Sequence, residues 1–526
     1  MNVLVADHLS DEGIQILKAQ DGLKVDVKIG LSPKELAGII KPYEGLIVRS
    51  STKVTAEVIQ KADRLKVIGR AGVGLDNVDV DAATKRGIIV MNVPGGNTIS
   101  AAEHTMSLLL ALARHVPRAD AHLRAGKWER AAFTGTELFG KTLGVVGLGK
   151  IGSEVAKRAQ AFGMRILAHD PFLSTEHVQQ LEAQVVGFDE LLESSDFITL
   201  HVPLTSQTRH LIGPKEFKKM RKGVRLINCA RGGIIDEAEL ANAIGNGTVA
   251  GAALDVFEQE PPGENPLFKL PQIVVTPHLG AATEEAQLNV AIEVAKQVAD
   301  TLLGRGIRNA VNMPSVDAKT LQLLQPYITL GEKMGSLAAQ LVGAQVAEVR
   351  VTFVGEVTQH NTAPVTLAVL KGILEPMVGE SVNYVNASFI ASERGVKLVE
   401  AKSNRSEEFA NLVTVEVISD GTRLELQGTL SVRREPRIVK IDRFVVEAVP
   451  TGYMLVIKNH DKPGLIGHLG TVLGDAKINI AGMSNGREKP GGLAVTVVNV
   501  DQAVSPNVLA KIKTFKQIID AKLISL

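Results

Sequence analysis

Short apolar runs alternate with helix-length segments along residues 1–98, and this alternation constrains the fold more than any other feature of the chain. The apolar runs are "VLVA", "VDVKI", "GLIVRS" and "LKVIGRAG". One segment between them, "SPKELAGII", places Ser32 and Glu35 at capping-box spacing and Pro33 at the first helical position. Strands separated by helices in this way pair in parallel through right-handed crossovers. The sequence therefore predicts a doubly wound α/β lobe.

A second alternating set begins at "KTLGVVGLGKIGSEVAKRAQAFGMRILAHD" and predicts a second parallel-sheet lobe. It continues through "DFITLHVP", "GVRLINCARGG", "GAALDVF" and "QIVVTPHLG". The stretch "TISAAEHTMSLLLALARHV" before it reads as one long, mostly apolar helix, which we expect to be buried between domains or between subunits. A single helical segment, "EEAQLNVAIEVAKQVADTLLG", follows the second set.

The pattern changes after about residue 316. From "EVRVTFVGEV" to "RFVVEAVP" the apolar residues alternate with a period of two, which predicts an antiparallel α+β domain over residues 316–451. Residues 452–526 form a separate set in the order strand, helix, strand, strand, helix, strand. That order is typical of a ferredoxin-like module.

Composition excludes several classes of function. The formal net charge is +1, too small to favour nucleic acid or a membrane surface. The only cysteine is Cys229, which excludes intramolecular disulfides and a Cys-rich zinc site, and the twelve histidines show no metal-like spacing. No run approaches the ~20 apolar residues of a membrane span, and "MNVLVADHLS" reads as a strand rather than a signal peptide. We expect a cytoplasmic protein without a metal.

A glycine-rich loop predicts a dinucleotide site. Gly147, Gly149 and Gly152 have G-x-G-x-x-G spacing, follow an apolar strand and open a helix. Such glycines permit a tight turn, close approach of a pyrophosphate and close packing of helix on sheet. The next strand ends in Asp170, whose carboxylate would accept from ribose hydroxyls and repel a 2′-phosphate. This favours NAD over NADP, the alternative being a glycine-rich turn beside a surface aspartate.

Three later strand ends each supply a charged or titratable residue. Arg231 follows one strand, Asp255 and Glu260 follow the next, and His278 follows the last. Strand ends of an open parallel sheet face the ligand crevice. Oxidation of an alcohol needs a base such as histidine, a carboxylate raises the pKa of that histidine, and the arginine fork matches a substrate carboxylate. Each residue taken alone could instead be structural.

With these residues in place, the chain resembles the D-isomer-specific 2-hydroxyacid dehydrogenases. The segments that carry the resemblance are "GLGKIG", "NCARGGIIDEAEL", "GAALDVFEQEPP" and "TPHLGAAT". It implies that Arg231 holds the substrate carboxylate and that Glu260 pairs with His278, the acid/base. The implied cofactor-site residues are Gly147, Gly149, Lys150, Ile151, Gly152, Asp170, Cys229, Ala230, Asp255 and Gly280.

The resemblance extends over the whole chain to the long branch of this family, which acts on 3-phospho-D-glycerate in L-serine synthesis. "LIVRSSTKVT", "VIGRAGVGLDNVD" and "GKWERAAFTGTEL" carry it in the N-terminal half. The implied domains are a substrate-binding domain (1–98 and 285–315), an NAD-binding Rossmann domain (99–284), an intervening domain of the allosteric substrate-binding type (316–451) and an ACT domain (452–526).

This branch also implies substrate contacts and an oligomer. The implied substrate-binding residues are Arg49, Ser50, Arg70, Gly72, Asn97 and Arg130. The family places Arg130 in the neighbouring subunit's site, so we expect a homodimer at least and a homotetramer as the larger assembly.

The last module has no catalytic constellation, so we expect a regulatory role. In "KNHDKPG" a helix N-terminus could bind a carboxylate, Asp461 could take an ammonium, and Asn459 and Asn479 could complete the site across a paired module. The ligand that the resemblance implies is L-serine. The alternative is a dimerisation module without a ligand.

Two other functions stay open at this point. The family includes NAD(H)-sensing corepressors that keep the dehydrogenase fold. A dehydrogenase for another 2-hydroxy acid, such as glycolate (glyoxylate) or lactate, would use the same catalytic residues.

Overall fold

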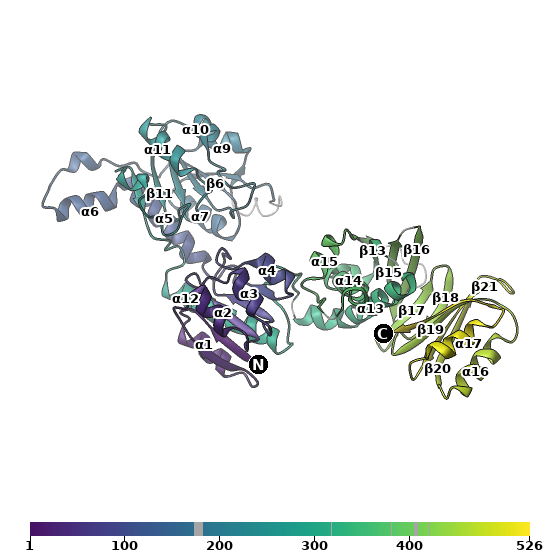
Figure 1. The fold of residues 1–526 in the computed structure, drawn as a ribbon. Helices are drawn as coiled ribbons and strands as arrows, with labels where there is room; N and C mark the ends of the chain where they lie inside the picture. The colour runs from purple at the N-terminus through teal and green to yellow at the C-terminus, as the bar shows by residue number, and fades with distance from the viewer. Residues whose placement is uncertain (173–181, 317, 344, 380, 404–408, 420) are drawn as a thin grey trace.

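In the part of the chain that the structure describes, four β-sheets follow one another along the sequence (Figure 1). The computed structural model describes residues 1–526 except 173–181, 317, 344, 380, 404–408 and 420. Two parallel sheets form the N-terminal half and two largely antiparallel sheets the C-terminal half, which confirms the predicted fold class. No helix among the described residues has the length and apolar character that crossing a membrane would need.

The first lobe is built on a parallel sheet of order β2-β1-β3-β4-β5. Its strands are β1 (Asn2–Val5), β2 (Lys24–Val27), β3 (Gly45–Val48), β4 (Val67–Arg70) and β5 (Ile89–Met91). Its helices are α1 (Asp11–Lys18), α2 (Pro33–Ile39), α3 (Ala56–Lys61), α4 (Val80–Lys85) and, from later in the chain, α12 (Glu284–Leu302). Ser32 and Glu35 form the predicted capping box at α2. Because α12 packs on α1 and β4, the chain returns to this lobe after the second one.

The second lobe has a parallel sheet of order β12-β11-β10-β9-β6-β7-β8. Its strands are β6 (Thr142–Val146), β7 (Arg165–His169), β8 (Gln184–Val185), β9 (Phe197–Leu200), β10 (Val224–Asn228), β11 (Val249–Leu254) and β12 (Ile273–Val275). The further helices are α7 (Lys150–Ala161), α9 (Phe188–Ser194), α10 (Pro214–Lys219), α11 (Glu237–Gly245) and the 3₁₀ turn η2 (Pro266–Lys269). The short edge strand β8, which is exposed, was not predicted.

The long apolar helix before this lobe is interrupted. α5 (Thr98–Arg114) ends at His115, whose φ of 56° is left-handed, and α6 (Val116–Arg124) begins directly after it. α5 buries Leu109 and Leu112 in the core it shares with α7 and the second sheet. By contrast, α6 buries no residue and projects from the lobe (Figure 1). The stretch predicted as one helix, residues 98–116, is therefore helical as α5 up to Arg114, and the break at His115 falls one residue before its end.

The third sheet has the order β14-β13-β15-β16-β17-β18. It is antiparallel except for the parallel pair β13–β14, whose crossover contains a 3₁₀ turn followed by α-helices. The strands are β13 (Val346–Gly355), β14 (Lys397–Ser403), β15 (Asn411–Ser419), β16 (Thr422–Leu430), β17 (Pro436–Ile441) and β18 (Phe444–Ala448). The helices are α13 (Ala318–Val342), η3 (Glu356–Gln359), α14 (Ala363–Val378) and α15 (Ala387–Glu393).

The C-terminal module has the predicted βαββαβ order and the sheet order β20-β21-β19-β22. Its elements are β19 (Tyr453–His460), α16 (Leu465–Asp475), β20 (Ile480–Arg487), β21 (Leu493–Val500), α17 (Pro506–Lys513) and β22 (Ile518–Ser525). Its helices cover one face of the sheet, over Leu455, Ile457 and Val498. β19 continues to His460, further than predicted.

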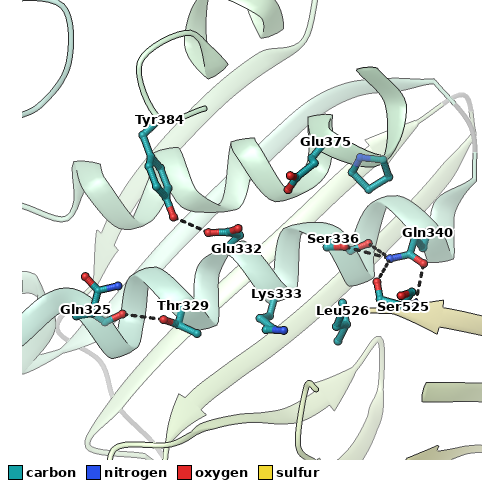
Figure 2. A pocket seen from close by; sticks show the side chains of 11 residues that line it. Gln325, Thr329, Glu332, Lys333, Ser336, Gln340, Glu375, Tyr384, Ser525 and Leu526 are labelled. Carbon is teal, nitrogen blue, oxygen red and sulfur yellow. Dashed lines mark hydrogen bonds between the residues drawn. The ribbon is translucent and has the colours of Figure 1, made fainter. Parts of the chain in front are cut away.

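The other face of this module packs against α13, and β18 of the third sheet lies beside β20 and β21, so the module and the third sheet share one core. Met454, Val456, Val495, Val497 and Ile524 belong to the same buried cluster as the side chains of α13 and β13–β18. At the rim, a cavity of about 530 Å³ lies between α13, α14 and the end of β22 (Figure 2). There the Gln340 amide bonds the backbone of Ser525 in both directions, at 2.8 and 3.0 Å. The two C-terminal sheets therefore form one packed unit.

Candidate active site

His278 and Glu260 form a hydrogen-bonded pair at the carboxyl end of the second sheet. His278 Nδ1 lies 2.7 Å from Glu260 Oε2, and Glu260 Oε1 accepts from the Phe257 amide. The bond to Glu260 raises the pKa of His278 against the opposing effect of its burial. Burial raises the pKa of Glu260, but the bonds from His278 and Phe257 outweigh it and leave that pKa below its usual value. The Nδ1 atom of the imidazole is thus hydrogen-bonded to a carboxylate.

The cavity beside this pair lies between the two lobes. It measures about 520 Å³ and is lined by His278 and Glu260 of the second lobe and by Ser50 of the first, which follows β3. Phe257, Phe268 and prolines supply most of the remaining lining. A small polar molecule in this cavity would therefore meet one titratable pair on a largely apolar wall.

Arg231 reaches from the second lobe to the first. Its Nε lies 3.3 Å from Asp76 Oδ2, and its Nη1 donates to the Ala230 carbonyl. A Cβ at Gly74 would stand 2.2 Å from Arg231 Nη2, so a larger residue there would displace the guanidinium from this position. The exposed carboxylate of Asp76 is a partner that an anionic ligand could replace.

Arg49 and Arg70 stand close enough to Arg231 to form a positive cluster. Burial, together with the charges of Arg231 and Arg49, lowers the pKa of Arg70 to about 10, which still leaves it charged at neutral pH. Arg70 folds over Gly72, where a Cβ would lie 1.6 Å from its Nη1. Within the described residues, the buried Arg70 Nε finds no hydrogen-bond acceptor. Arg49 Nη1 donates to the His8 carbonyl. The cluster suits a doubly charged anion.

The other two predicted substrate residues lie in different places. Asn97 precedes α5, and its buried Oδ1 has no donor among the described residues. Arg130 is exposed at the start of η1 (Arg130–Phe133), which follows the projecting α6. It lines neither the cavity at His278 nor the cleft at the glycine loop. Within one chain, the structure does not bring Arg130 to the other arginines.

The glycine loop has the geometry that a dinucleotide requires. Gly147 has φ of 89°, and a Cβ there would lie 2.7 Å from the His201 carbonyl. A Cβ at Gly152 would lie 2.1 Å from the Gly147 carbonyl, whereas Gly149, the N-cap of α7, faces open space. Ile151 packs into the core beside α5, and Lys150 Nζ donates to the Pro94 carbonyl in the crossover between lobes. The α7 N-terminus is thus free to receive a pyrophosphate.

Asp170 stands at the end of β7, on the rim of a cleft of about 910 Å³ that the glycine loop also lines. Its two oxygens accept from the amides of Leu148 and Phe172, at 3.0 and 2.9 Å. One carboxylate thus braces the loop and presents a negative charge beside it. These residues fit an adenosine ribose without a 2′-phosphate.

Four further predicted cofactor-site residues lie where β10 and β11 end and in the loop after β12. Burial raises the pKa of Cys229 to about 12, so the thiol is neutral. Ala230 donates its amide to the Asn228 side chain. Asp255 is fully buried, and its side chain accepts from the amide of Gly280 at 2.9 Å. Because protein donors take up the Asp255 carboxylate, its direct role in this structure is to hold the loop.

The predicted effector residues are divided between two ends of the C-terminal module. Asn459 is buried and bonded to Thr496 and the His460 carbonyl, while Asp461 bonds Arg487 and the Gly491 amide. Asn479 lies at the opposite end of β20 and donates to Asp501. Within one chain, therefore, the structure does not bring Asn479 together with the other two.

Sequence reasoning missed several residues around the site. Asp76 faces Arg231 across the lobes, and Ser100, His104 and Thr276 bond the segment that carries His278. The one available signal was the i, i+4 spacing of Ser100 and His104, which puts both on one helix face. In the described part of the chain, no group of three His, Cys, Asp or Glu side chains is placed to hold a metal.

Comparisons with known proteins agree with this geometry. Residues 106–280 match the NAD binding domain of the D-isomer specific 2-hydroxyacid dehydrogenases, 323–442 the D-3-phosphoglycerate dehydrogenase intervening domain, and 453–516 the ACT domain. Among solved structures, a D-lactate dehydrogenase from Aquifex aeolicus, complexed with NAD and lactic acid, is 31% identical over 58% of this chain and 96% of its own, with a TM-score of 0.52. A glyoxylate reductase from Paecilomyes thermophila is also 31% identical, over 59% and 98%, with a TM-score of 0.55.

Relatives of full length are more similar. The D-3-phosphoglycerate dehydrogenase of Archaeoglobus fulgidus is 49% identical over 100% of both chains. That of Bacillus subtilis is 43% identical over 100% of this chain and 99% of its own. The chain therefore belongs to the D-3-phosphoglycerate dehydrogenases, within the NAD-dependent D-isomer-specific 2-hydroxyacid dehydrogenase family.

Proposed function

We propose that this protein oxidises the C2 hydroxyl of 3-phospho-D-glycerate to 3-phosphohydroxypyruvate, with NAD as the oxidant, as the first step of L-serine synthesis. The observation that supports this most directly is the His278–Glu260 pair, which shares its cavity with Ser50 of the other lobe. The full-length relatives that bear this enzyme name support the choice of substrate.

His278 is the group that moves the proton. Its Nδ1 is committed to Glu260, so Nε2 takes the proton of the C2 hydroxyl. The Glu260 carboxylate then stabilises the imidazolium. NAD, when bound, accepts the hydride from C2, so the alcohol loses one hydride and one proton and becomes a ketone. Turnover in this direction needs neutral His278 and rises with pH through its raised pKa.

The arginine cluster binds the two ends of the substrate. Arg231 takes the C1 carboxylate with its fork and releases Asp76, while Arg49 and Arg70 take the phosphate. Gly72, over which Arg70 folds, and Asn97, whose buried Oδ1 has no donor among the described residues, are further substrate-binding residues in this proposal. Arg130 acts from the neighbouring subunit in a homodimer or larger assembly.

The regulatory part of the proposal concerns L-serine. The ACT domain binds it where two modules pair, with Asn459, Asp461 and Asn479 at the site, and binding favours a less active arrangement of the lobes. An effector differential of ~1–3 kcal/mol is usual. L-serine should lower kcat more than it raises KM, because it binds far from the substrate. A cytoplasmic location completes the proposal.

One assay tests the reaction. NADH formation is followed across 3-phospho-D-glycerate, glycolate and D-lactate, with and without millimolar L-serine. The proposal requires the highest kcat/KM with the phosphorylated acid. Turnover with the unphosphorylated acids alone would assign another substrate, and tight NAD binding without any turnover would indicate an NAD(H)-sensing protein. Absence of L-serine binding by calorimetry would remove the regulatory part.

A further inference from the structure

The loop that carries His278 is anchored by a buried carboxylate. Asp255 is fully buried, and its side chain accepts from the Leu279 amide at 2.7 Å, the Gly280 amide at 2.9 Å and the Thr276 hydroxyl at 2.6 Å. Its backbone carbonyl accepts from the His278 amide at 2.9 Å. Three successive amides, 278–280, therefore end on one residue. A buried charge needs such a set of donors to stay ionised.

His278 needs this anchor because its backbone is strained. Its φ of 55° is left-handed, a conformation that residues with a Cβ keep only when their surroundings hold them there. The imidazole must also stay within bonding distance of Glu260. A loop released from Asp255 would relax this backbone and move the ring.

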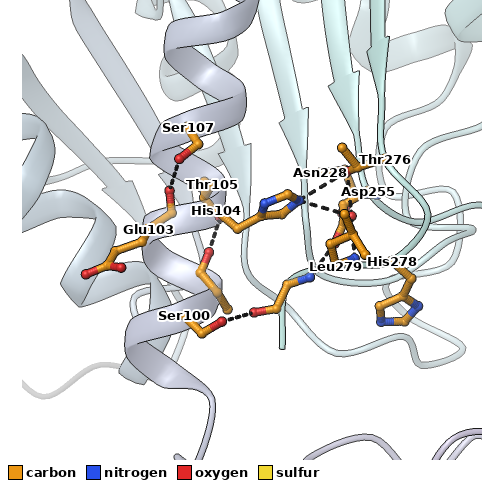
Figure 3. A network of polar contacts seen from close by, with 12 residues as sticks. Ser100, Glu103, His104, Thr105, Ser107, Asn228, Asp255, Thr276, His278 and Leu279 are labelled. Carbon is orange, nitrogen blue, oxygen red and sulfur yellow. Dashed lines mark hydrogen bonds and ion pairs between the residues drawn. The ribbon is translucent and has the colours of Figure 1, made fainter. Parts of the chain in front are cut away.

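Two side chains on one face of α5 contact the same loop, one before His278 and one after it. His104 Nε2 lies 3.1 Å from Asp255 Oδ1 and 3.1 Å from Thr276 Oγ1, before His278, and Ser100 Oγ donates to the Gly280 carbonyl at 2.9 Å, after it. Figure 3 shows His104 pointing from the helix into this network while the ring of His278 points away from it. Since α5 is packed into the core through Leu109 and Leu112, both side chains start from a fixed position.

We propose that His104, supported by Ser100 one turn earlier, is a positioning residue that holds the Asp255–Thr276 network and through it fixes His278 against Glu260. The inference rests on the proposed function, in which His278 moves the proton. His104 touches neither substrate nor cofactor in this account. Its effect reaches the reaction through the loop, so it should appear in kcat and in the titration of His278, with KM for NAD unchanged.

The test compares four variants of the full-length protein. His104→Ala removes the contact, whereas His104→Gln keeps an N–H donor toward Asp255. Ser100→Ala removes the bond at the other end of the loop. Ser107→Ala is the matched control, since Ser107 lies exposed on the same helix and bonds only the Glu103 carbonyl. Each variant is assayed for kcat, KM and thermal midpoint.

The readout that does not depend on turnover is the pKa of His278, followed by NMR of ¹³Cε1-labelled histidine without substrate or NAD and assigned with His278→Gln. We expect His104→Ala to lower kcat about tenfold, the scale of a small displacement of a catalytic group, and to lower the pKa of His278 as Glu260 moves away. His104→Gln should recover most of both. Ser100→Ala should show a smaller change of the same kind, and Ser107→Ala none.

Three results would overturn the inference. They are an unchanged kcat and His278 pKa in His104→Ala, an equal loss in His104→Gln, or a change confined to the thermal midpoint. If His104→Ala does not fold, Ser100→Ala against Ser107→Ala decides in the same way. If the wild type does not oxidise 3-phospho-D-glycerate, the proposed function fails, while the NMR titration still decides whether His104 positions His278.

Discussion

The two halves of the molecule join their sheets in opposite ways. In the N-terminal half each lobe has its own buried clusters, and the contacts that cross between the lobes at the site are polar: Arg231 with Asp76, and Lys150 with the Pro94 carbonyl. In the C-terminal half the third sheet and the ACT sheet share one cluster of apolar side chains. A polar contact can exchange its partner for a ligand or water at little cost, whereas an apolar one cannot.

From this difference we expect the two N-terminal lobes to move relative to each other, and the two C-terminal sheets to stay fixed to each other. In the proposed function, the lobes close on a substrate as its carboxylate replaces Asp76 at Arg231. The intervening and ACT domains should move as a single body. A ligand bound at the ACT domain should therefore shift both domains together. The predictions below test either side of this contrast.

The largest effect should come from the chemistry in the cleft. We expect His278→Ala to lower kcat by about 10²–10⁴-fold, because the general base is lost, while NAD binding survives on the glycine loop. NADH formation and NAD titration by calorimetry measure the two effects. Turnover like that of the wild type would end the assignment of His278.

Next comes the shared core of the C-terminal half. Ile524→Ala removes a fully buried side chain of β22 from the shared core and should lower the free energy of unfolding of that half by about 2–5 kcal/mol. Ile519→Ala, at an exposed residue of the same strand, is the control and should change it by less than about 0.5 kcal/mol. Denaturant unfolding with turnover as the second probe should show the catalytic half unaffected by both. Similar losses in the two variants would contradict a shared core.

Glu260→Gln should lower kcat about tenfold and shift the acid limb of the pH–rate profile for oxidation to lower pH. The sign follows from the pair: the carboxylate raises the pKa of His278, so its loss lets the ring become neutral at lower pH. Glu264→Gln, an exposed neighbour, should leave the profile in place. A shift to higher pH would show that another group titrates.

Asp170→Ala should raise the ratio of kcat/KM for NADP to that for NAD by about tenfold, because a like-charge contact with the 2′-phosphate is removed. Steady-state assays with both cofactors measure it. If the wild type already used the two equally, Asp170 would not be the discriminator.

The smallest effect is expected at the lobe contact. Asp76→Asn removes a competitor of the substrate for Arg231, and an exposed ion pair is worth ~0–1 kcal/mol, so KM for 3-phospho-D-glycerate should fall by at most about fivefold. The change should shrink at high salt. A rise in KM would mean that Asp76 orients Arg231 rather than competing for it.

Local signals in the sequence predicted much of this structure. The capping box at Ser32 and the left-handed Gly147 are set by neighbours in the chain, and both are as expected. The division of Asn459 and Asn479 between two ends of a sheet depends on strand register, which no local pattern reported. The roles of Asp255 and His104 depend on burial and on a contact between distant elements.

The second covered face of the ACT sheet did leave a signal. "MLVI" in β19 is continuously apolar, and a strand buried on one face only should alternate. Met454 and Val456 belong to the core shared with α13 and the third sheet, whereas Leu455 and Ile457 belong to the core under the helices of the module. The run was predicted as a strand, but no partner was predicted for its second face.

The shared core also sets where this chain can be recombined. If the ACT domain alone were exchanged, the new domain would replace the sheet face that carries Met454. Its apolar side chains would then not match those of the intervening domain in the shared core. An exchange made between α12 and α13 would transplant the intervening and ACT domains as one cassette. The solved glyoxylate reductase and D-lactate dehydrogenase match only 58–59% of this chain with nearly all of their own length. They therefore fold without such a cassette. For chimeras, the transferable unit is therefore the pair of C-terminal sheets.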